Sequence, residues 1–191
     1  TSWNLALAHG VDVYTVKGKV ETKPTTSNFK NQLPDKDVLG YIIPWESFTQ
    51  AQFLAELLKQ NIEVTTTTKP FTIENKPYNR GSLIITKTNN KQEDLDSIVT
   101  AVANQFEIKL HKTKTGFSDS GTDFGSPDIK KIHPQRIAVL RDKGVSTLSY
   151  GSVWHFFEKD LNYPVISIST DNFSKIDLSF YDVLILPNGR Y

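Results

Sequence analysis

The chain has 191 residues, of which 38% are hydrophobic and 23% are charged, and its formal net charge is +1. This composition is typical of a folded globular protein with a real core, and the small net charge gives no global field that would attract nucleic acid or an anionic membrane. Cysteine is absent, which excludes thiol catalysis, zinc–thiolate sites and disulfides. Methionine is absent too, so we expect a processed product or a piece of a longer chain.

The first residues predict the end of one domain and a linker to the next. Residues 1–16 finish in an alternating run at Val11, Val13 and Val16, which predicts a strand. Residues 17–36 are polar and contain two prolines, which favours a linker. We therefore expect 1–16 to be the tail of a preceding domain, followed by a linker over 17–36.

Strands and helices alternate over residues 37–118. "DVLGYIIPW" predicts a strand and "ESFTQAQFLAELLKQN" a helix, since Ser47 and Gln50 form a capping-box pattern and Asn61 suits a left-handed position after the helix. "IEVTTTT" and "SLIIT" predict strands on either side of a hairpin-like stretch, and "FEIKLHKT" predicts another. Asn90 with Glu93 predicts the start of a second helix. We expect one α/β domain here.

The last third predicts a second boundary and a second α/β unit. Residues 119–135 lie in a stretch rich in Gly, Ser, Asp and Pro, which favours a linker. Over 136–191, "RIAVL", "YPVISIS" and "YDVLILP" predict strands, with "SYGSVWHFFEKDLN" as a helix between the first two. Strands that alternate with helices predict a layered α/β fold with largely parallel sheets and flanking helices, flavodoxin-like in its last part.

Short catalytic motifs occur, but ordinary structural roles explain them. His155 and Glu158 have the spacing of two zinc ligands, yet a catalytic zinc needs a third, and His133 lies in a loop that nothing places nearby. Asp119 begins an Asp-Ser-Gly triplet of the aspartic-protease kind, but that triplet must follow a strand and here it follows a loop. Turn chemistry explains these three residue types without catalysis. Ser152 lacks a Gly-x-Ser-x-Gly elbow. The sequence therefore predicts no catalytic residue and no metal ligand.

A binding rim is the better-supported site. If the strands that end at Leu140, Ser169 and Leu186 are parallel, their carboxyl ends line one edge of a sheet, where open α/β folds bind ligands. The loops that follow supply polar groups to that edge. The candidate binding residues are Arg141, Asp142, Ser149, Tyr150, Asn188 and Gly189. A polar rim without a ligand explains the same residues.

Taken together, the longer phrases resemble the region that follows the catalytic domain in large bacterial zinc-carboxypeptidase-like proteins of the metallocarboxypeptidase family. The phrases occur in the same order in that group: "SWNLALAHGVDVY", "GYIIPWES", "AELLKQNIEV", "KPFTIENKPYNRGSLII", "GTDFGSPDIKKIHPQRIAVL", "YGSVWHFFEKDLNYPVISI" and "YDVLILPNGRY". The resemblance covers nearly the whole chain and rests on loops and strands, not on catalytic residues.

The last third also resembles the start of a class I glutamine amidotransferase-like domain. In that superfamily a Pro-Gly-Gly turn after the third strand helps to form the oxyanion hole, whereas this chain has Pro187, Asn188 and Gly189. The nucleophile elbow is absent, and without cysteine the chain cannot carry the amidotransferase reaction. The resemblance implies an incomplete unit of that fold.

The resemblance implies a parent protein that is a hydrolase, a secreted or periplasmic zinc metallopeptidase acting on peptide C-termini. Its zinc ligands would lie before Thr1, so zinc is implied for the parent's catalytic domain and no cofactor for this chain. We expect a non-catalytic accessory α/β region whose partner is the parent's own peptidase domain. The alternative is a module that binds a small molecule or a partner at the rim.

Overall fold

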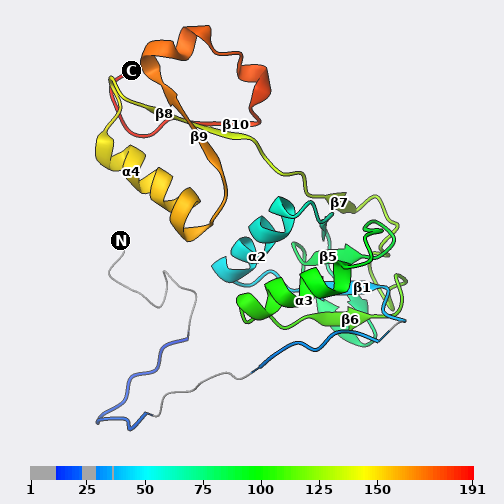
Figure 1. Ribbon diagram of the computed structural model, residues 1–191. Coiled ribbons are helices and arrows are strands. Elements are labelled where there is room, and N and C mark those ends of the chain that lie inside the picture. Colours follow the sequence, from blue (N-terminus) through cyan, green and yellow to red (C-terminus); the bar gives the residue numbers. More distant parts are fainter. Residues whose placement is uncertain (1–11, 23–28, 36) are drawn as a thin grey trace.

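The computed structural model describes residues 12–22, 29–35 and 37–191, and the described chain beyond residue 37 forms two units (Figure 1). The strand expected across Val11, Val13 and Val16 begins outside the described residues, and residues 12–16 form no strand. Val13 and Val16 are exposed. Alternation alone does not make a strand, because a strand needs a partner to bond with.

The first unit is built on a five-stranded sheet in the order β6-β1-β5-β2-β7. The strands are β1 (Gly40–Ile43), β2 (Thr65–Thr67), β5 (Leu83–Thr86), β6 (His111–Thr113) and β7 (Ile129–Lys131). Each neighbouring pair in this sheet is antiparallel. A separate two-stranded hairpin is formed by β3 (Phe71–Ile73) and β4 (Lys76–Tyr78).

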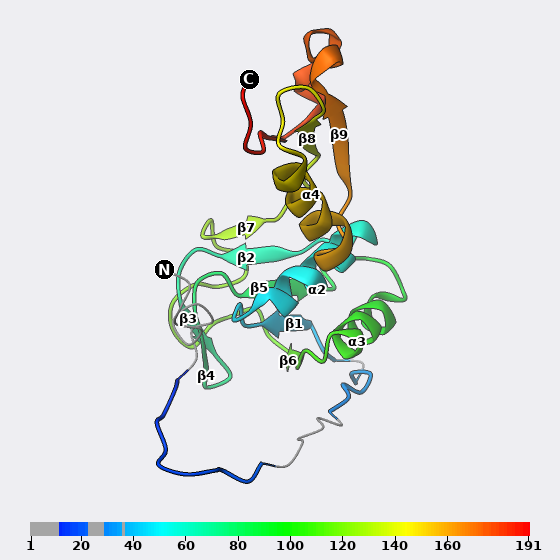
Figure 2. The ribbon, with the colours of Figure 1, turned by 90° about the vertical axis from the view of Figure 1, so that its left-hand side faces the viewer.

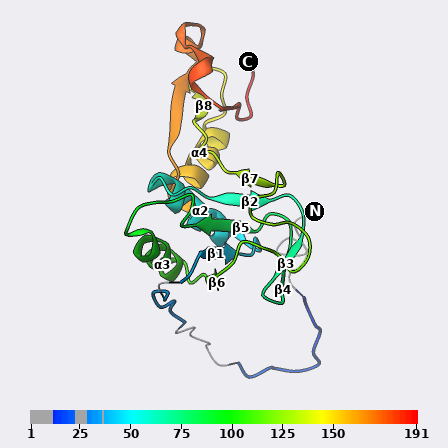
Figure 3. The same ribbon diagram turned by 90° about the vertical axis from the view of Figure 1, so that its right-hand side faces the viewer.

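Two helices and the hairpin cover opposite faces of the sheet (Figures 2 and 3). Helices α2 (Phe48–Lys59) and α3 (Leu95–Gln105) pack on Tyr41 and Ile43 of β1, whereas Ile42 packs against Phe71 and Tyr78 of the hairpin. Successive side chains of a strand point to opposite faces, so both faces of β1 bury apolar groups. The predicted capping box of Ser47 and Gln50 is present, and Asn61 adopts a φ of 58°.

The mixed α/β class is confirmed, but the expectation of a largely parallel sheet is wrong for the first unit. "GYII" and "SLIIT" are continuous apolar runs, which are typical of parallel strands because those are buried on both faces. Here the hairpin supplies the second cover, so the same burial arises in antiparallel strands. The pattern of apolar residues reports burial and not strand direction.

Two further expectations in the first unit needed correction. Helix α3 begins at Leu95 with Asp94 before it, not at Asn90. Asn90 is instead buried and binds backbone groups, donating to the carbonyls of Glu63 and Thr86 and accepting from the Glu63 N–H. Its amide therefore joins the chain before β2 to the end of β5.

The two segments predicted as linkers both contact the first unit. Asn31 donates to the Asn104 side chain and to the Ile108 carbonyl, and its side-chain oxygen accepts from the Leu110 N–H. Residues 119–135 contain strand β7, which pairs with β2. Ile129 follows a Pro-Asp turn and Lys130 and Lys131 are polar, so the segment lacks the apolar pattern that identifies a strand.

The second unit is a three-stranded parallel sheet in the order β10-β8-β9. It consists of β8 (Ile137–Arg141), α4 (Thr147–His155), a π-helical turn (Phe156–Asp160), β9 (Val165–Ser169), two 3₁₀ turns (Thr170–Lys175 and Leu178–Phe180) and β10 (Val183–Ile185). The three strands and the first helix were predicted, and here the parallel arrangement is confirmed. Ser146 caps α4, since its hydroxyl accepts from the Ser149 N–H.

The units meet where α2 packs against the second sheet. Ala55 of α2 is buried against Ile137 and Tyr163, with Phe157 of the π-helical turn and Leu161 just after it beside them. Gln52 donates to the Asp160 carbonyl, and the rings of Phe48 and Phe156 lie 5.6 Å apart. Helix α2 therefore contributes to both cores.

None of the described helices has the length and apolar character needed to cross a membrane.

Candidate functional site

The carboxyl ends of β8, β9 and β10 lie at one edge of the second sheet, as the sequence predicts. Val183 pairs with Ile137 and Arg141 with Ser169, so the three strands run in the same direction in close register. The central strand β8 comes first in the chain, with β9 on one side and β10 on the other. The connection from β8 leads to β9 on one side, and the next connection leads to β10 on the other side of β8. At the point where the strand order reverses in this way, an open α/β sheet forms a crevice.

Three of the predicted residues line a cavity of about 510 Å³ between β8, β9 and the start of α4: Arg141, Asp142 and Tyr150. The Tyr150 hydroxyl lies 2.6 Å from the Ser167 Oγ across this cavity. Arg141 forms a 3.1 Å ion pair with Asp142, whose φ is 76°. The cavity lining therefore includes a bonded pair of hydroxyls and a neutralised charge pair.

The other three predicted residues lie at the neighbouring contact between the β8 and β10 loops. Asn188 and Gly189 line a second cavity of about 440 Å³, and the Asn188 N–H donates to the Ser149 Oγ over 2.9 Å. A Cβ on Gly189 would lie 2.2 Å from the Gly144 carbonyl oxygen, so only glycine permits this approach of the loops. The structure thus brings all six residues to one rim: five line two adjoining cavities, and Ser149 is joined to them by its hydrogen bond with Asn188.

An apolar cavity of about 530 Å³ lies beside this rim. Its apolar wall comes from Leu140, Phe173, Leu184, Leu186 and Tyr191. Leu186 and Tyr191 are exposed. The sequence analysis did not find this cavity, because part of its wall comes from the 3₁₀ turns and from the chain after β10.

The other reactive side chains singled out in the sequence are bound to neighbours in the fold. Ser152 donates to the Leu148 carbonyl one turn earlier in α4. Asp119 accepts from the Asn75 N–H in the hairpin turn. The Nδ1 of His155 lies 3.4 Å from a carboxylate oxygen of Asp160, so its carboxylate partner is Asp160 and not Glu158. His133 lines a cleft next to α2, with Ala55 and Tyr163.

The described residues do not form a set that fits a zinc ion. No group of three or more His, Cys, Asp or Glu side chains in the described chain lies close enough to hold a metal. The His155–Asp160 pair is exposed and supplies two groups at most, whereas a catalytic zinc takes three protein ligands.

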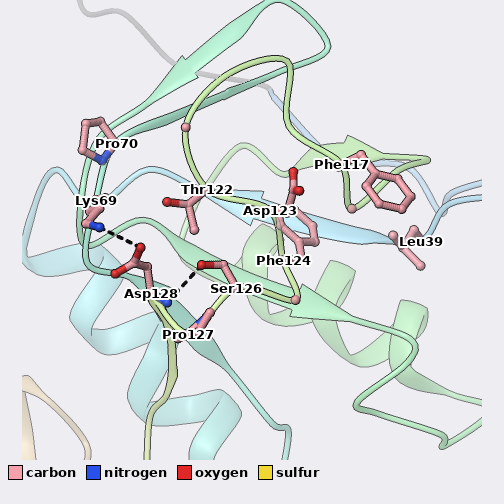
Figure 4. A pocket seen from close by; sticks show the side chains of 13 residues that line it. Leu39, Lys69, Pro70, Phe117, Thr122, Asp123, Phe124, Ser126, Pro127 and Asp128 are labelled. Carbon is pink, nitrogen blue, oxygen red and sulfur yellow. Dashed lines mark hydrogen bonds and ion pairs between the residues drawn. The ribbon is translucent and has the colours of Figure 1, made fainter.

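A further cavity, of about 940 Å³, lies in the first unit between the loop 114–128 and the start of the hairpin (Figure 4). The loop is ordered by bonds to the hairpin: Thr72 donates to the Ser120 carbonyl and accepts from the Asp119 N–H. Gly121 lies against the chain at Pro70, and a Cβ there would come within 2.6 Å of the Pro70 carbonyl oxygen at a φ of 90°. The loop is therefore fixed in shape.

Charged and aromatic groups line this cavity. Lys69 and Asp128 form a 2.9 Å ion pair on one side. On the other side lie Phe117 and Asp123. The N–H and Oγ of Ser118 both donate to one oxygen of Asp123, which lowers the pKa of that carboxyl. The Gly-, Ser- and Asp-rich composition of this loop predicted only turns. The signal in the sequence that could have indicated a binding cavity was Phe117, a large aromatic residue within a polar loop.

Comparison of the chain with protein-family models, with curated proteins and with solved structures finds no match.

Proposed function

We propose that this chain is a non-catalytic accessory α/β region of a zinc-carboxypeptidase-like protein, and that its partner is the peptidase domain of that parent. The family part of the proposal rests on the ordered phrases in the sequence. The accessory role rests on the structural use of Ser152, Asp119 and His155, each of which lies against a neighbour within the fold. The parent is a secreted or periplasmic bacterial hydrolase, and zinc belongs to its catalytic domain.

The junction between the two units supports this role. Ala55, Ile137 and Tyr163 share one buried cluster, so the units hold each other in a fixed relation, as a positioning region requires.

In the second unit, the order β10-β8-β9 is that of strands three, one and two of a flavodoxin-like sheet. This order supports our proposal of a flavodoxin-like, amidotransferase-like fold for that unit.

Two measurements test the proposal. The purified chain, given Zn²⁺ and reporter peptides cleaved at their C-terminal residue, is expected to release no product. Release that a chelator abolishes would overturn the non-catalytic assignment. Separately, the encoded sequence before residue 1 is expected to contain a His-x-x-Glu pair with a distant third histidine. A preceding coding sequence that lacks these residues would overturn the family assignment.

A second function, small-molecule binding at the rim, is favoured by the convergence of five of the six predicted residues on two adjoining cavities. A ligand there would stabilise the fold by a few kcal/mol when present well above its dissociation constant. A thermal-shift screen of polar metabolites tests this function. We expect a saturable rise in melting temperature that Tyr150→Phe reduces and that Ser174→Ala, at an exposed position outside the rim, leaves unchanged. A screen without any saturable shift would reject the rim as a ligand site.

A further inference from the structure

The cavity of about 940 Å³ in the first unit has the volume of a ligand site and a wall that is fixed before any ligand binds. The Phe117 N–H donates to the Thr115 Oγ1, and the Phe124 N–H donates to the Gly116 carbonyl. The ring of Phe124 packs edge-on against Phe71 of the hairpin. Backbone and ring contacts therefore set the positions of Phe117 and Asp123 in advance, which reduces the entropy that a ligand must lose on binding.

Phe117 is 80% exposed at the edge of this cavity. A large apolar ring at this exposure is not stabilised by burial in the core of the protein, so its free face is open to a ligand. Asp123 is held beside it, since one carboxylate oxygen accepts both hydrogen bonds from Ser118, the next residue after Phe117. The other oxygen of Asp123 accepts no hydrogen bond from the described chain. Figure 4 shows the ring and the carboxylate on the same side of the cavity.

The charges that surround the cavity select the kind of ligand. Lys69 and Asp128 neutralise each other at 2.9 Å, which leaves the carboxylate of Asp123 as the unneutralised charge of the cavity lining. An aromatic face next to a carboxylate favours a cation, because the ring quadrupole and the anion attract the same charge. Of the biological cations, a planar guanidinium stacks on a ring while it donates to a carboxylate.

We propose that this cavity binds a guanidinium group, presented by an arginine side chain of a peptide, between the Phe117 ring and the Asp123 carboxylate. The rest of the peptide lies toward Pro70 and the Lys69–Asp128 pair. This site is separate from the rim of the second unit and does not depend on the family of the parent. A single side chain at an open site gives weak binding, with a dissociation constant on the order of 1 mM.

The test uses N-acetyl-arginine amide and the neutral N-acetyl-citrulline amide, which has nearly the same shape. Titration into the ¹⁵N-labelled chain, followed by amide NMR shifts, is expected to move signals of residues 116–128 with arginine and not with citrulline. Raising NaCl from about 50 mM to about 200 mM is expected to weaken the binding several-fold, because the charges are exposed. Equal binding of both amides, or no shift at either salt concentration, would overturn the proposal.

Asp123→Asn and Asp119→Asn form a matched pair of variants. Both remove one negative charge from the same loop, and Asn keeps an oxygen that can accept the existing hydrogen bonds, but only Asp123 lines the cavity. We expect Asp123→Asn to weaken arginine binding at least tenfold and Asp119→Asn to change it less than twofold. Equal losses in the two variants would mean diffuse attraction and would reject the site. Phe117→Ala is expected to weaken binding about threefold, and Leu148→Ala, at an equally exposed position, to leave it unchanged.

Discussion

The hydroxyl of Tyr78 lies 3.0 Å from the Nδ1 of His111, across the edge between the hairpin and strand β6. Tyr78 is buried and stacks on Phe71, while His111 is half-buried. Burial, reinforced by the positive charges of Lys76 and Lys109, lowers the pKa of His111, and Glu46 opposes that shift. The hairpin is thus held to the sheet by a pair that contains a neutral histidine.

This pair makes the stability of the chain depend on pH. The unfolded state takes up a proton on His111 near pH 6.5, while the folded state takes it up at a lower pH. The free energy of unfolding is therefore expected to fall as pH decreases from 6.5 through the folded pKa, because the unfolded state binds more protons there. Urea unfolding at about pH 7.5 and about pH 5.5 measures this difference. His111→Gln should reduce this difference, and an equal difference in His111→Gln and in the unchanged chain would contradict the role of His111.

Asn90 is expected to be one of the costliest polar residues to remove. It is 4% exposed and its side chain makes three hydrogen bonds to backbone groups. Asn90→Ala leaves the Glu63 N–H and two carbonyls without this partner, for a loss of about 1–3 kcal/mol in unfolding free energy. Asn89→Ala, at an exposed neighbouring position, is the control and should change stability by less than about 0.5 kcal/mol. Chemical denaturation measures the unfolding free energy of the two variants. Equal denaturation midpoints would contradict the stabilising role of the Asn90 side chain.

Asn90 also shows which parts of the structure can be predicted from the sequence and which cannot. Apolar periodicity located β1, α2 and the three strands of the second unit, because each buries a continuous face. Asn90 followed by Glu93 has the spacing of a helix start, but its amide is used by a segment 27 residues earlier in the chain. Strand β7 was missed for a similar reason, since its pairing with β2 is backbone hydrogen bonding that leaves no apolar signature. The six rim residues were predictable because parallel strands fix where their ends lie, whereas the loop cavity depends on long-range contacts.

Gly121 is expected to tolerate no side chain. Its φ is 90°, and an added Cβ would lie 2.6 Å from the Pro70 carbonyl oxygen and 2.8 Å from the Phe71 Cα. Gly121→Ala must therefore move the loop away from the hairpin, and we expect a loss of roughly 2 kcal/mol or more. Gly125→Ala is the matched control in the same loop, since nothing lies within 4 Å of its Cβ position. Comparable melting temperatures for the two variants would refute the predicted contact.

Ala55 couples the two units, and a charge at this position should uncouple them. Ala55→Asp buries a carboxylate among Ile137 and Tyr163, which costs roughly 3 kcal/mol if the units stay docked. The units are expected to separate instead, so that calorimetry should record two transitions in Ala55→Asp and a single transition in the unchanged chain. Ala101→Asp, on the exposed side of α3, should keep the single transition. A single, merely lowered transition in Ala55→Asp would show that the units unfold together without this contact.

Asp182 should titrate at unusually low pH. Arg136 binds it through the guanidinium and through the backbone N–H, and these bonds lower the pKa of Asp182 to about 2. The contribution of this pair to stability is present above the unfolded value of about 3.9 and is lost as pH falls through about 2. A ¹³C NMR titration of the carboxyl carbons measures the pKa directly. In Arg136→Gln we expect the pKa to rise toward the unfolded value, and an unchanged pKa would disprove the assignment.

The outer strands of the parallel sheet have a consequence for how the chain behaves at high concentration. Within the described chain β9 and β10 each pair on one side only, and they carry Ile166 at 51% exposure and Val183 at 38%. An unpaired strand edge with exposed apolar side chains is a template for another chain, whereas charged residues discourage such pairing. The outer strands of the antiparallel sheet have that protection, with Lys130 and Lys131 on β7 and Lys112 on β6. Aggregation should therefore start at Ile166 or Val183, and a lysine at either position should raise solubility.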